Sequence, residues 1–436
     1  MPATRAGGQP RWMSRSGTNF KLAASVRSKG YSGVGQRITG AILLALLIGL
    51  GAAPSAFAQQ GNLRMGNIYY DLSSYFEIEY NDNINYSNLN RQWDIILRPG
   101  IQLTSSYQVS QINTLTFGVG LSYQQYLIHP NLSSYNSFLS VSPNSQLAYT
   151  ILIRNLTIKI YDAFAYAVDP SNSVAFNSKT GQLVYSISQY PRFTNQIGAS
   201  FDWNLNKVIP YADIYRLDVF PQQSQFSILR RWEYNLSLGV RVIVSPSVIV
   251  GLGGSYTADY YQQNYNNDST SYFMGPSVSW QANSNWTFSA SGGYIFYSFS
   301  TGGLNGDSSQ PSTLVGSVAV MNHFSSNFDH SINFTRTSSF GYVSNTIAIN
   351  RIAYQASWRF HPRWTANFWA YYEQGQDSGG PNSENYFKYS VSPGVDYEVN
   401  THLSTYGTYE FTQNTSNIIG RTYTRNRVIV GVRYEF

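Results

Sequence analysis

Five histidines have the widest range of possible chemistry in this chain, because imidazole serves as a general base and as a metal ligand near neutral pH. They are His129, His323, His330, His361 and His402. None has a serine and an acid at a spacing that would place a catalytic triad on one face of a strand. His323 and His330 flank a turn at 325–327 and can approach one another, but histidine at a strand end is the simpler interpretation. We predict no triad and no metal site.

Pairs of acidic residues are the next candidates for chemistry. Glu77 and Glu79, like Asp396 and Glu398, are two residues apart and would share one face of a strand. Glycoside hydrolysis needs two carboxylates held about 5 to 9.5 Å apart around a sugar. Charge on the polar face of a strand is a much commoner reason for this spacing, so we do not assign these acids to catalysis.

Two glycine-rich runs are similar to phosphate-binding loops in composition only. GVGLSY at 118–123 and GLGGSY at 251–256 lie inside alternating segments with no helix after them, so the context of a nucleotide site is missing. Glycine there relieves crowding or allows a strand to curve. The chain also has no cysteine, which excludes disulfides and thiolate metal sites. We therefore predict that the protein is not an enzyme and binds no cofactor.

The composition favours strands with one apolar and one polar face. Of 436 residues, 11% are charged and 16% are aromatic, with 36 Tyr and 35 Gly, whereas a disordered chain would hold more charge and fewer aromatics. The net charge of +6 comes from residues 1–58, which contain seven basic residues and no acid. From Gln59 onward, 21 basic residues are balanced by 22 acids, so no nucleic-acid partner is predicted.

The N-terminal segment has the layout of a secretory signal peptide. A basic stretch precedes the apolar run ITGAILLALLIGLGAAPSAFA at 38–58, which ends in small residues at Ala56 and Ala58. We expect cleavage after Ala58, which leaves 59–436 as one domain. An anchoring transmembrane helix is the alternative, but the apolar core at 38–50 is shorter than the ~20 residues that span a bilayer.

From Ile68 onward, alternating segments of strand length recur, separated by turns or by polar loops. Alternation with a period of two and turn residues at this spacing predict antiparallel strands joined by hairpins. The eighteen predicted strands lie near 70–80, 91–105, 112–127, 139–150, 154–168, 193–205, 208–220, 228–243, 247–261, 270–282, 285–299, 312–324, 327–339, 347–360, 363–375, 385–399, 402–414 and 424–436.

The connections alternate in length, which indicates a barrel. Short turns follow the even-numbered strands and longer loops follow the odd-numbered ones, the pattern of an outer-membrane protein. Hydrocarbon gives backbone amides no partner, so a sheet that spans a membrane must close on itself. A soluble β-sandwich would carry more lysine than the four found after residue 58. We predict an all-β fold: a transmembrane antiparallel β-barrel of about 18 strands (16–18), with short periplasmic turns and long extracellular loops.

The last ten residues, RVIVGVRYEF, show the alternation most clearly. One face, predicted to meet lipid, holds Val428, Val430, Val432, Tyr434 and Phe436. The other face, predicted to meet the lumen, holds Arg427, Ile429, Gly431, Arg433 and Glu435. Closure of the barrel requires the last strand to pair with the first, so this end of the chain must be ordered and must fit the membrane.

A barrel of this size leaves an aqueous channel unless something fills it. Rings of arginine lower the barrier for anions, and acids on the same wall offset them, so we expect mild selectivity. Trp369 and Tyr371 share a predicted lumen face, where aromatic rings would suit stacking on sugars. The predicted pore-lining charges are Arg98, Arg231, Arg241, Arg351, Arg359, Arg427, Arg433, Glu77, Glu79, Asp94, Glu233, Asp396 and Glu398.

The long loop at 169–192 contains QLVYSISQY, which is unusually apolar for an exposed loop tip. We predict that this loop folds inward and narrows the pore. A packed extracellular flap and an extra hairpin outside the membrane are the alternatives.

Two features of the sequence resemble known bacterial proteins. A terminal aromatic residue, Phe436, preceded by alternate apolar positions, is similar to the signal by which the insertion machinery recognises outer-membrane barrels. The segment EIEYNDNINYSN…RQWDIILRPGIQL (77–103) resembles the opening hairpin of the β-barrel porin-2 group, and YAVDPSN…QYPRFTNQIGASFDWNLN (166–206) is similar to a later stretch of that group. The group includes barrels that are encoded with exopolysaccharide export systems. The resemblance implies an outer-membrane channel of poorly defined substrate.

These observations predict a porin-like channel in the outer membrane of a Gram-negative bacterium, for passive diffusion of small hydrophilic solutes. The alternatives are an accessory barrel of an exopolysaccharide export system and a non-conducting structural or adhesive barrel. The expected partners are outer-membrane lipid, the barrel-insertion machinery and small hydrophilic solutes or saccharides. A homo-oligomer is compatible with the sequence, which does not identify a subunit face.

Overall fold

The computed structural model describes residues 62–130, 140–167, 175–176, 183–184, 191–222, 224–341, 344–381, 383–418 and 421–436. The predicted signal peptide and its cleavage site at Ala56 and Ala58 lie outside the described residues. Within the described part of the chain, no helix is both long enough and apolar enough to cross a membrane.

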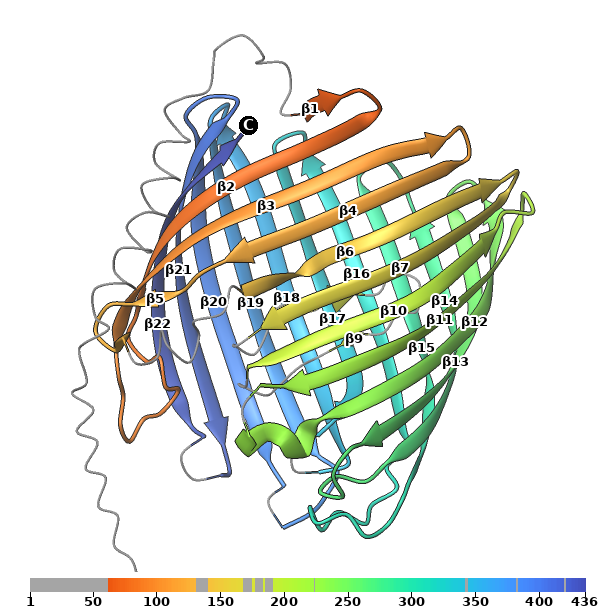
Figure 1. Ribbon diagram of the computed structural model, residues 1–436, viewed down its shortest axis with the longest axis vertical. Coiled ribbons are helices and arrows are strands. Elements are labelled where there is room, and N and C mark those ends of the chain that lie inside the picture. Colours follow the sequence, from red (N-terminus) through yellow and green to blue (C-terminus); the bar gives the residue numbers. More distant parts are fainter. Residues whose placement is uncertain are drawn as a thin grey trace, which may run out of the picture. The chain divides into compact units, whose positions relative to one another are not determined.

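The main sheet is a closed antiparallel barrel of eighteen long strands, counted over the described residues (Figure 1). The strands are β2 (Ile68–Asn81), β3 (Asp94–Ser110), β4 (Asn113–Ser122) with its continuation β5 (Gln125–Tyr126), β6 (Ser140–Ile153), β7 (Leu156–Ala167), β10 (Arg192–Trp203), β11 (Val208–Pro221), β12 (Arg231–Ser245), β13 (Val248–Tyr261), β14 (Ser269–Gln281), β15 (Trp286–Phe299), β16 (Thr313–Ser325), β17 (Phe328–Phe340), β18 (Thr346–His361), β19 (Trp364–Asp377), β20 (Asn385–Glu398), β21 (Leu403–Ser416) and β22 (Tyr423–Glu435).

The barrel closes between its first and last long strands. Residues Ser73–Asn81 of β2 pair with Arg427–Glu435 of β22, and the N–H of Phe436 donates to the carbonyl of Leu72 at 3.0 Å. Among the described long strands this seam joins the first to the last, which closes the sheet as a membrane-spanning sheet requires. The predicted fold class and strand number are confirmed.

Connections alternate in length as predicted. Eight turns of two to four residues join the strands at one end of the barrel, which we call the short-turn end. The opposite end, which we call the long-loop end, carries the longer connections. One of them contains a 3₁₀ turn, η1 (Ser224–Leu229), so β12 begins at Arg231 and not at 228 as predicted.

Three small strands were not predicted. The strand β1 (Asn62–Met65) pairs with the start of β2. The strands β8 (Ala175–Phe176) and β9 (Leu183–Val184) form a separate antiparallel pair. The other residues of the loop predicted to fold inward, apart from its end at 191–192, lie outside the described residues.

Side chains alternate between an apolar outer face and a polar inner face. On β12, Tyr234 and Leu238 are 43% and 53% exposed, whereas Asn235 and Ser237 are 3% and 2% exposed. On β22, Val428, Val430 and Val432 are all exposed. A continuous apolar outer band would be unfavourable in water and suits the hydrocarbon of a membrane.

Aromatic side chains gather in two belts on the outer face. Near the short-turn end, Trp364 and Tyr397 have ring centroids 4.5 Å apart, and Trp280 and Phe288 are 5.3 Å apart. The belt near the long-loop end includes the pairs Tyr80–Trp93, Trp232–Tyr260 and Tyr372–Phe387. Two such girdles mark the two membrane–water interfaces of outer-membrane barrels.

On the inner face, five tyrosine rings lie across the glycine directly opposite on the next strand. The pairs are Tyr75–Gly100, Tyr161–Gly198, Tyr211–Gly239, Tyr386–Gly375 and Tyr406–Gly431. Cross-strand aromatic residues that cover glycine pin the register of a curved sheet. The Tyr386 ring is also fixed at its far end, because its hydroxyl donates to Glu373 at 2.8 Å.

Substituting valine for Gly375 tests this packing. A Cβ at this position would lie 2.1 Å from Cε1 of Tyr386, so the ring must move and lose its hydrogen bond to Glu373. We expect the free energy of unfolding in lipid vesicles, measured by urea titration, to fall by about 1–3 kcal/mol. Gly407→Ala is the control, since nothing lies within 4 Å of its added Cβ. Equal stability of the two variants would contradict the proposed role of the tyrosine rings.

Candidate pore lining

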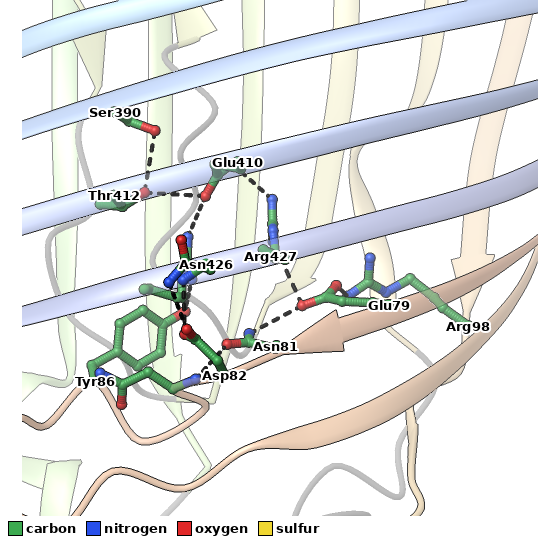
Figure 2. A network of polar contacts seen from close by, with 12 residues as sticks. Glu79, Asn81, Asp82, Tyr86, Arg98, Ser390, Glu410, Thr412, Asn426 and Arg427 are labelled. Atoms are coloured by element: carbon green, nitrogen blue, oxygen red, sulfur yellow. Dashed lines mark hydrogen bonds and ion pairs between the residues drawn. The ribbon is translucent and has the colours of Figure 1, made fainter.

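The inner wall at the seam carries a connected set of charged side chains, which Figure 2 shows from close by. Arg98 on β3 donates to Glu77 and Glu79 on β2, with N···O distances of 2.9 and 2.7 Å. Arg427 on β22 lies 3.9 Å from Glu79 and donates to Glu410 on β21 at 3.0 Å. These contacts cross four consecutive strands, including the pair that closes the barrel.

Glu410 is held by three side chains of the inner wall. Its carboxylate accepts hydrogen bonds from Arg425 at 2.5 Å, from Arg427 at 3.0 Å and from the Thr412 hydroxyl at 3.3 Å. Arg425 also donates to the hydroxyl of Tyr86 at 2.7 Å. The Glu410 and Arg425 side chains are only 8% and 4% exposed. Buried charges require opposite charges and hydrogen bonds, so Glu410 compensates two arginines at once.

The seam network is electrically balanced. The hydroxyl of Tyr406 donates to Glu77 at 2.6 Å and ties the network to the tyrosine–glycine pairs. Its charged members are three acids and three arginines: Glu77, Glu79, Glu410, Arg98, Arg425 and Arg427. Such a wall presents little net charge to a solute, which is the physical basis of the mild selectivity that we predict.

Ion clusters of the same kind occur on the inner wall away from the seam. In the first cluster, Arg231 pairs with Glu233 and Asp259. In the second, Glu373 pairs with both Arg351 and Lys388. The third is the pair of Arg241 and Asp202. Sequence reasoning proposed the arginines but not Asp202, Asp259, Glu373 or Lys388. The partners emerge only from the register between strands.

The structure brings most of the predicted pore-lining charges into these clusters. Arg433 instead lies with its guanidinium carbon 5.8 Å from the centroid of the Tyr406 ring, and Asp396 accepts a hydrogen bond from Asn367. Arg359 and Glu398 are exposed near the short-turn end. The predicted pore-lining residues that form ion pairs are Arg98, Arg231, Arg241, Arg351, Arg427, Glu77, Glu79 and Glu233.

Asp94 has a structural environment that the sequence pattern did not indicate. Its carboxylate is 0% exposed and accepts the backbone N–H groups of Leu127, Ile128 and His129 at 2.9, 3.0 and 2.8 Å. The His129 ring lies within 2.9 Å of the same carboxylate. Asp94 therefore anchors the chain where it leaves β5.

His323 and His330 do not approach one another. Nδ1 of His323 contacts Asp329 at 2.6 Å, whereas Nε2 of His330 contacts Asn322 at 3.2 Å and its ring stacks on Phe328. Neighbouring positions on antiparallel strands place the two rings on opposite faces of the sheet. Among the described residues, no group of three or more His, Asp or Glu side chains is arranged to hold a metal ion.

Asp307 joins several of the long loops, and sequence reasoning missed it. Its carboxylate accepts the N–H groups of Ser309 and Asn345 at 2.8 Å each and the hydroxyl of Ser378 at 2.6 Å. Asn267 adds a hydrogen bond to the Asp307 carbonyl at 2.8 Å. Four loops that are far apart in sequence therefore meet at one aspartate, which we call the loop latch.

The pKa of Asp307 makes the loop latch sensitive to acid. Burial alone would raise the pKa of this carboxyl, but the hydrogen bonds from Asn345, Ser309 and Ser378 outweigh burial and hold the pKa below its ordinary value of 3.8. A lowered folded-state pKa stabilises the latch above pH 3.8, and that contribution is lost as the pH falls through the folded-state pKa.

We expect backbone amides of 300–312 to lose protection from hydrogen exchange as the pH falls below about 3.8. In Asp307→Asn the free energy of opening of the same amides should be lower at neutral pH by about 1.5–3 kcal/mol, the range for hydrogen bonds to a charged group. The protection of these amides should then change little as the pH falls. Asp329→Asn, at the short-turn end, is the control. A pH response that persists in Asp307→Asn would show that another group controls these loops.

The inner wall differs between the two ends of the barrel. Toward the long loops several of its acids are almost fully buried, with Glu79, Asp259 and Glu373 exposed by 2%, 0% and 3%. Toward the short turns, Gln355 is exposed and a cavity of about 530 Å³ lies against the wall between β16 and β21. Water therefore reaches the described wall mainly in its short-turn half.

No protein-family model matches the sequence, and no curated protein matches it. Among solved structures, a BenF-like porin from Pseudomonas fluorescens Pf-5 is similar over 85% of this chain and 100% of that chain, with a TM-score of 0.51 and 10% identity. OccAB3 from Acinetobacter baumannii aligns over 85% and 100% of the two chains, with a TM-score of 0.47 and 10% identity. OccK3 from Pseudomonas aeruginosa aligns over 84% of this chain and 95% of its own, with a TM-score of 0.46 and 11% identity. At these identities the likeness to the BenF-like porin shows a shared barrel fold.

Proposed function

We propose that this protein is an outer-membrane channel for passive diffusion of small hydrophilic solutes. The observation that carries the proposal is a barrel closed by β2 and β22, with an apolar outer face and an inner face lined by charged and polar side chains. The interiors of outer-membrane barrels are polar in channels and in plugged barrels alike, and a barrel of this strand number is wide enough to leave an aqueous channel unless something fills it.

The charge pattern supports a channel with weak ion selectivity. Five of its arginines, Arg98, Arg231, Arg241, Arg351 and Arg425, are compensated by acids of the same wall, which reduces the unpaired field that anions and cations meet. The buried ion clusters lie toward the long loops, and we assign the narrowest part of the solute path to that half.

The outer face supports the proposed location in the outer membrane of a Gram-negative bacterium. Lipid would cover the exposed valines of β22 and the two aromatic belts. We also propose that the insertion machinery recognises the C-terminal signal made of Val428, Val430, Val432, Tyr434 and Phe436.

Conductance across a planar lipid bilayer tests the channel directly. The purified protein should produce discrete current steps, and its reversal potential in a salt gradient should lie close to zero because selectivity is weak. Heat-modifiable migration on a gel verifies that the sample is folded. Folded protein without current steps would refute the channel and favour a non-conducting structural or adhesive barrel.

A second candidate function is an accessory barrel of an exopolysaccharide export system. Its support is the resemblance of 77–103 to the β-barrel porin-2 group, together with a cavity that contains Trp369 among hydroxyl and amide side chains. A strain lacking the gene should then lose surface polymer while passive uptake of small solutes is unchanged. Normal polymer in that strain would eliminate this candidate.

A further inference from the structure

The cavity of about 530 Å³ lies between two parallel rows of side chains that run across neighbouring strands on the inner wall. The first row consists of Met321, Ser331, Gln355, Trp369 and Ser392, each directly opposite the next in register. The second row, closer to the short turns, consists of His323, Asp329, Ser357, Asn367, Gly394 and Thr408. Since both rows lie in the water-accessible half of the lumen, the cavity can receive a solute.

Trp369 supplies an aromatic surface that is fixed in place. Its ring centroid is 4.8 Å from that of Tyr371, which is 5% exposed. The guanidinium carbon of Arg351 lies 5.6 Å from the centroid of Trp369 and 3.9 Å from that of Tyr371. Arg351 is itself held by Glu373 at 3.4 Å. A ring supported in this way loses little conformational entropy when a ligand stacks on it.

Hydrogen-bonding groups surround Trp369. Gln355 and Ser392 are its register partners on β18 and β20, and Ser331 lies beyond Gln355 on β17. Within the described residues, none of these three side chains has a hydrogen-bond partner in the protein. They can therefore donate to and accept from a ligand without breaking internal bonds.

The acidic side chains beside the cavity, Asp329 and Asp396, each have a hydrogen-bond partner, and neither offers a positive charge to an anion. Nδ1 of His323 contacts Asp329 at 2.6 Å, and the side-chain amide of Asn367 donates a hydrogen bond to Asp396. A phosphate or carboxylate ligand would need an uncompensated cation, and an apolar ligand would leave the amide and the hydroxyls unpaired at a free-energy cost. An uncharged ligand with one apolar face and many hydroxyls fits this lining better than either.

We propose that this cavity is a binding site for a pyranose ring of a neutral saccharide. The C–H face of the ring stacks on Trp369, and its hydroxyls bond to Gln355, Ser331 and Ser392. The cavity volume is within the range of small-ligand sites, about 300–1,000 Å³. This inference rests on the proposed channel function and names its solute class.

Calorimetric titration of the full-length mature barrel in detergent tests the site independently of conduction. The probes are maltotriose and cellotriose as neutral trisaccharides, with trigalacturonate as the charged comparison. We expect one neutral trisaccharide to bind in preference to trigalacturonate. In Trp369→Ala its dissociation constant should rise roughly ten-fold, as for loss of one stacked ring, and Trp369→Phe should recover most of the affinity.

Tyr372→Ala is the control, because this ring lies on the outer face of the same strand and is not part of the cavity lining, so its loss should leave the affinity unchanged. Retained heat-modifiable migration verifies that each variant is folded. Absence of binding by both neutral sugars, or equal affinity of Trp369→Ala and the unmodified protein, would overturn the saccharide site.

The planar-bilayer currents separate this inference from the proposed function. A conducting channel whose protein binds neither neutral sugar retains the function and loses the site. Trp369-dependent sugar binding by a barrel that conducts no current retains the site and refutes passive diffusion. If both hold, maltotriose or cellotriose should interrupt the current in a Trp369-dependent manner.

Discussion

Replacing Glu410 with alanine is expected to lower the free energy of unfolding by about 3–5 kcal/mol. The change leaves Arg425, whose side chain is 4% exposed, without its acid. Arg427 would keep only the 3.9 Å approach to Glu79. Buried charges that lose their partner are costly because neither water nor a counter-charge replaces it. Urea titration of the barrel in lipid vesicles measures the effect.

Glu435→Ala is the matched control for Glu410→Ala, because Glu435 is exposed and should contribute less than about 1 kcal/mol. A double-mutant cycle isolates the pair. The double variant Glu410→Gln with Arg425→Gln removes both charges. Its free energy of unfolding should therefore be higher than that of Glu410→Gln alone. If Glu410→Ala proved no more destabilising than Glu435→Ala, the seam network would have no stabilising role.

Deleting 427–436 is expected to abolish the folded barrel. The deletion removes the residues of β22 that pair with Ser73–Asn81 of β2. It therefore leaves two sheet edges with unpaired backbone groups, which hydrocarbon does not tolerate. We expect complete loss of heat-modifiable migration and of urea-resistant association with membranes.

A deletion of 62–65 is the control for the seam deletion. These residues form β1, which pairs only with the start of β2 in the described structure, so the barrel should still close. A truncated protein lacking 427–436 that remained heat-modifiable and membrane-inserted would show that β2 and β22 are not the closing strands.

The strands could be predicted because one physical rule applies along the whole described wall. A strand between lipid and water must alternate, so 363–375 was placed within two residues of β19 (Trp364–Asp377) at each end. The same rule put Val428 and Arg427 on opposite faces. It also puts both Trp369 and Gln355 on the inner face, where the register makes them direct neighbours.

Alternation gives the face of a residue but neither its partner nor its depth. Glu410 was not predicted as a site residue, because its pairing with Arg425 and Arg427 depends on the register of β21 against β22. Asp94 was predicted as a wall charge, but the chain after β5 folds back onto it. The loop latch at Asp307 depends on how four loops meet at the end of a closed sheet, which no local pattern encodes.

Cysteine scanning of β18 tests most directly whether this sheet separates lipid from water. The chain has no cysteine, so single cysteines from 352 to 360 can be labelled cleanly in lipid vesicles. Positions 353, 355, 357 and 359 should react with a charged, membrane-impermeant thiol reagent. Fluorophores attached at 352, 354, 356, 358 and 360 should be quenched by nitroxide lipids. Reactivity without a period of two, or with the two sets exchanged, would contradict a lipid-facing outer wall around a water-filled lumen.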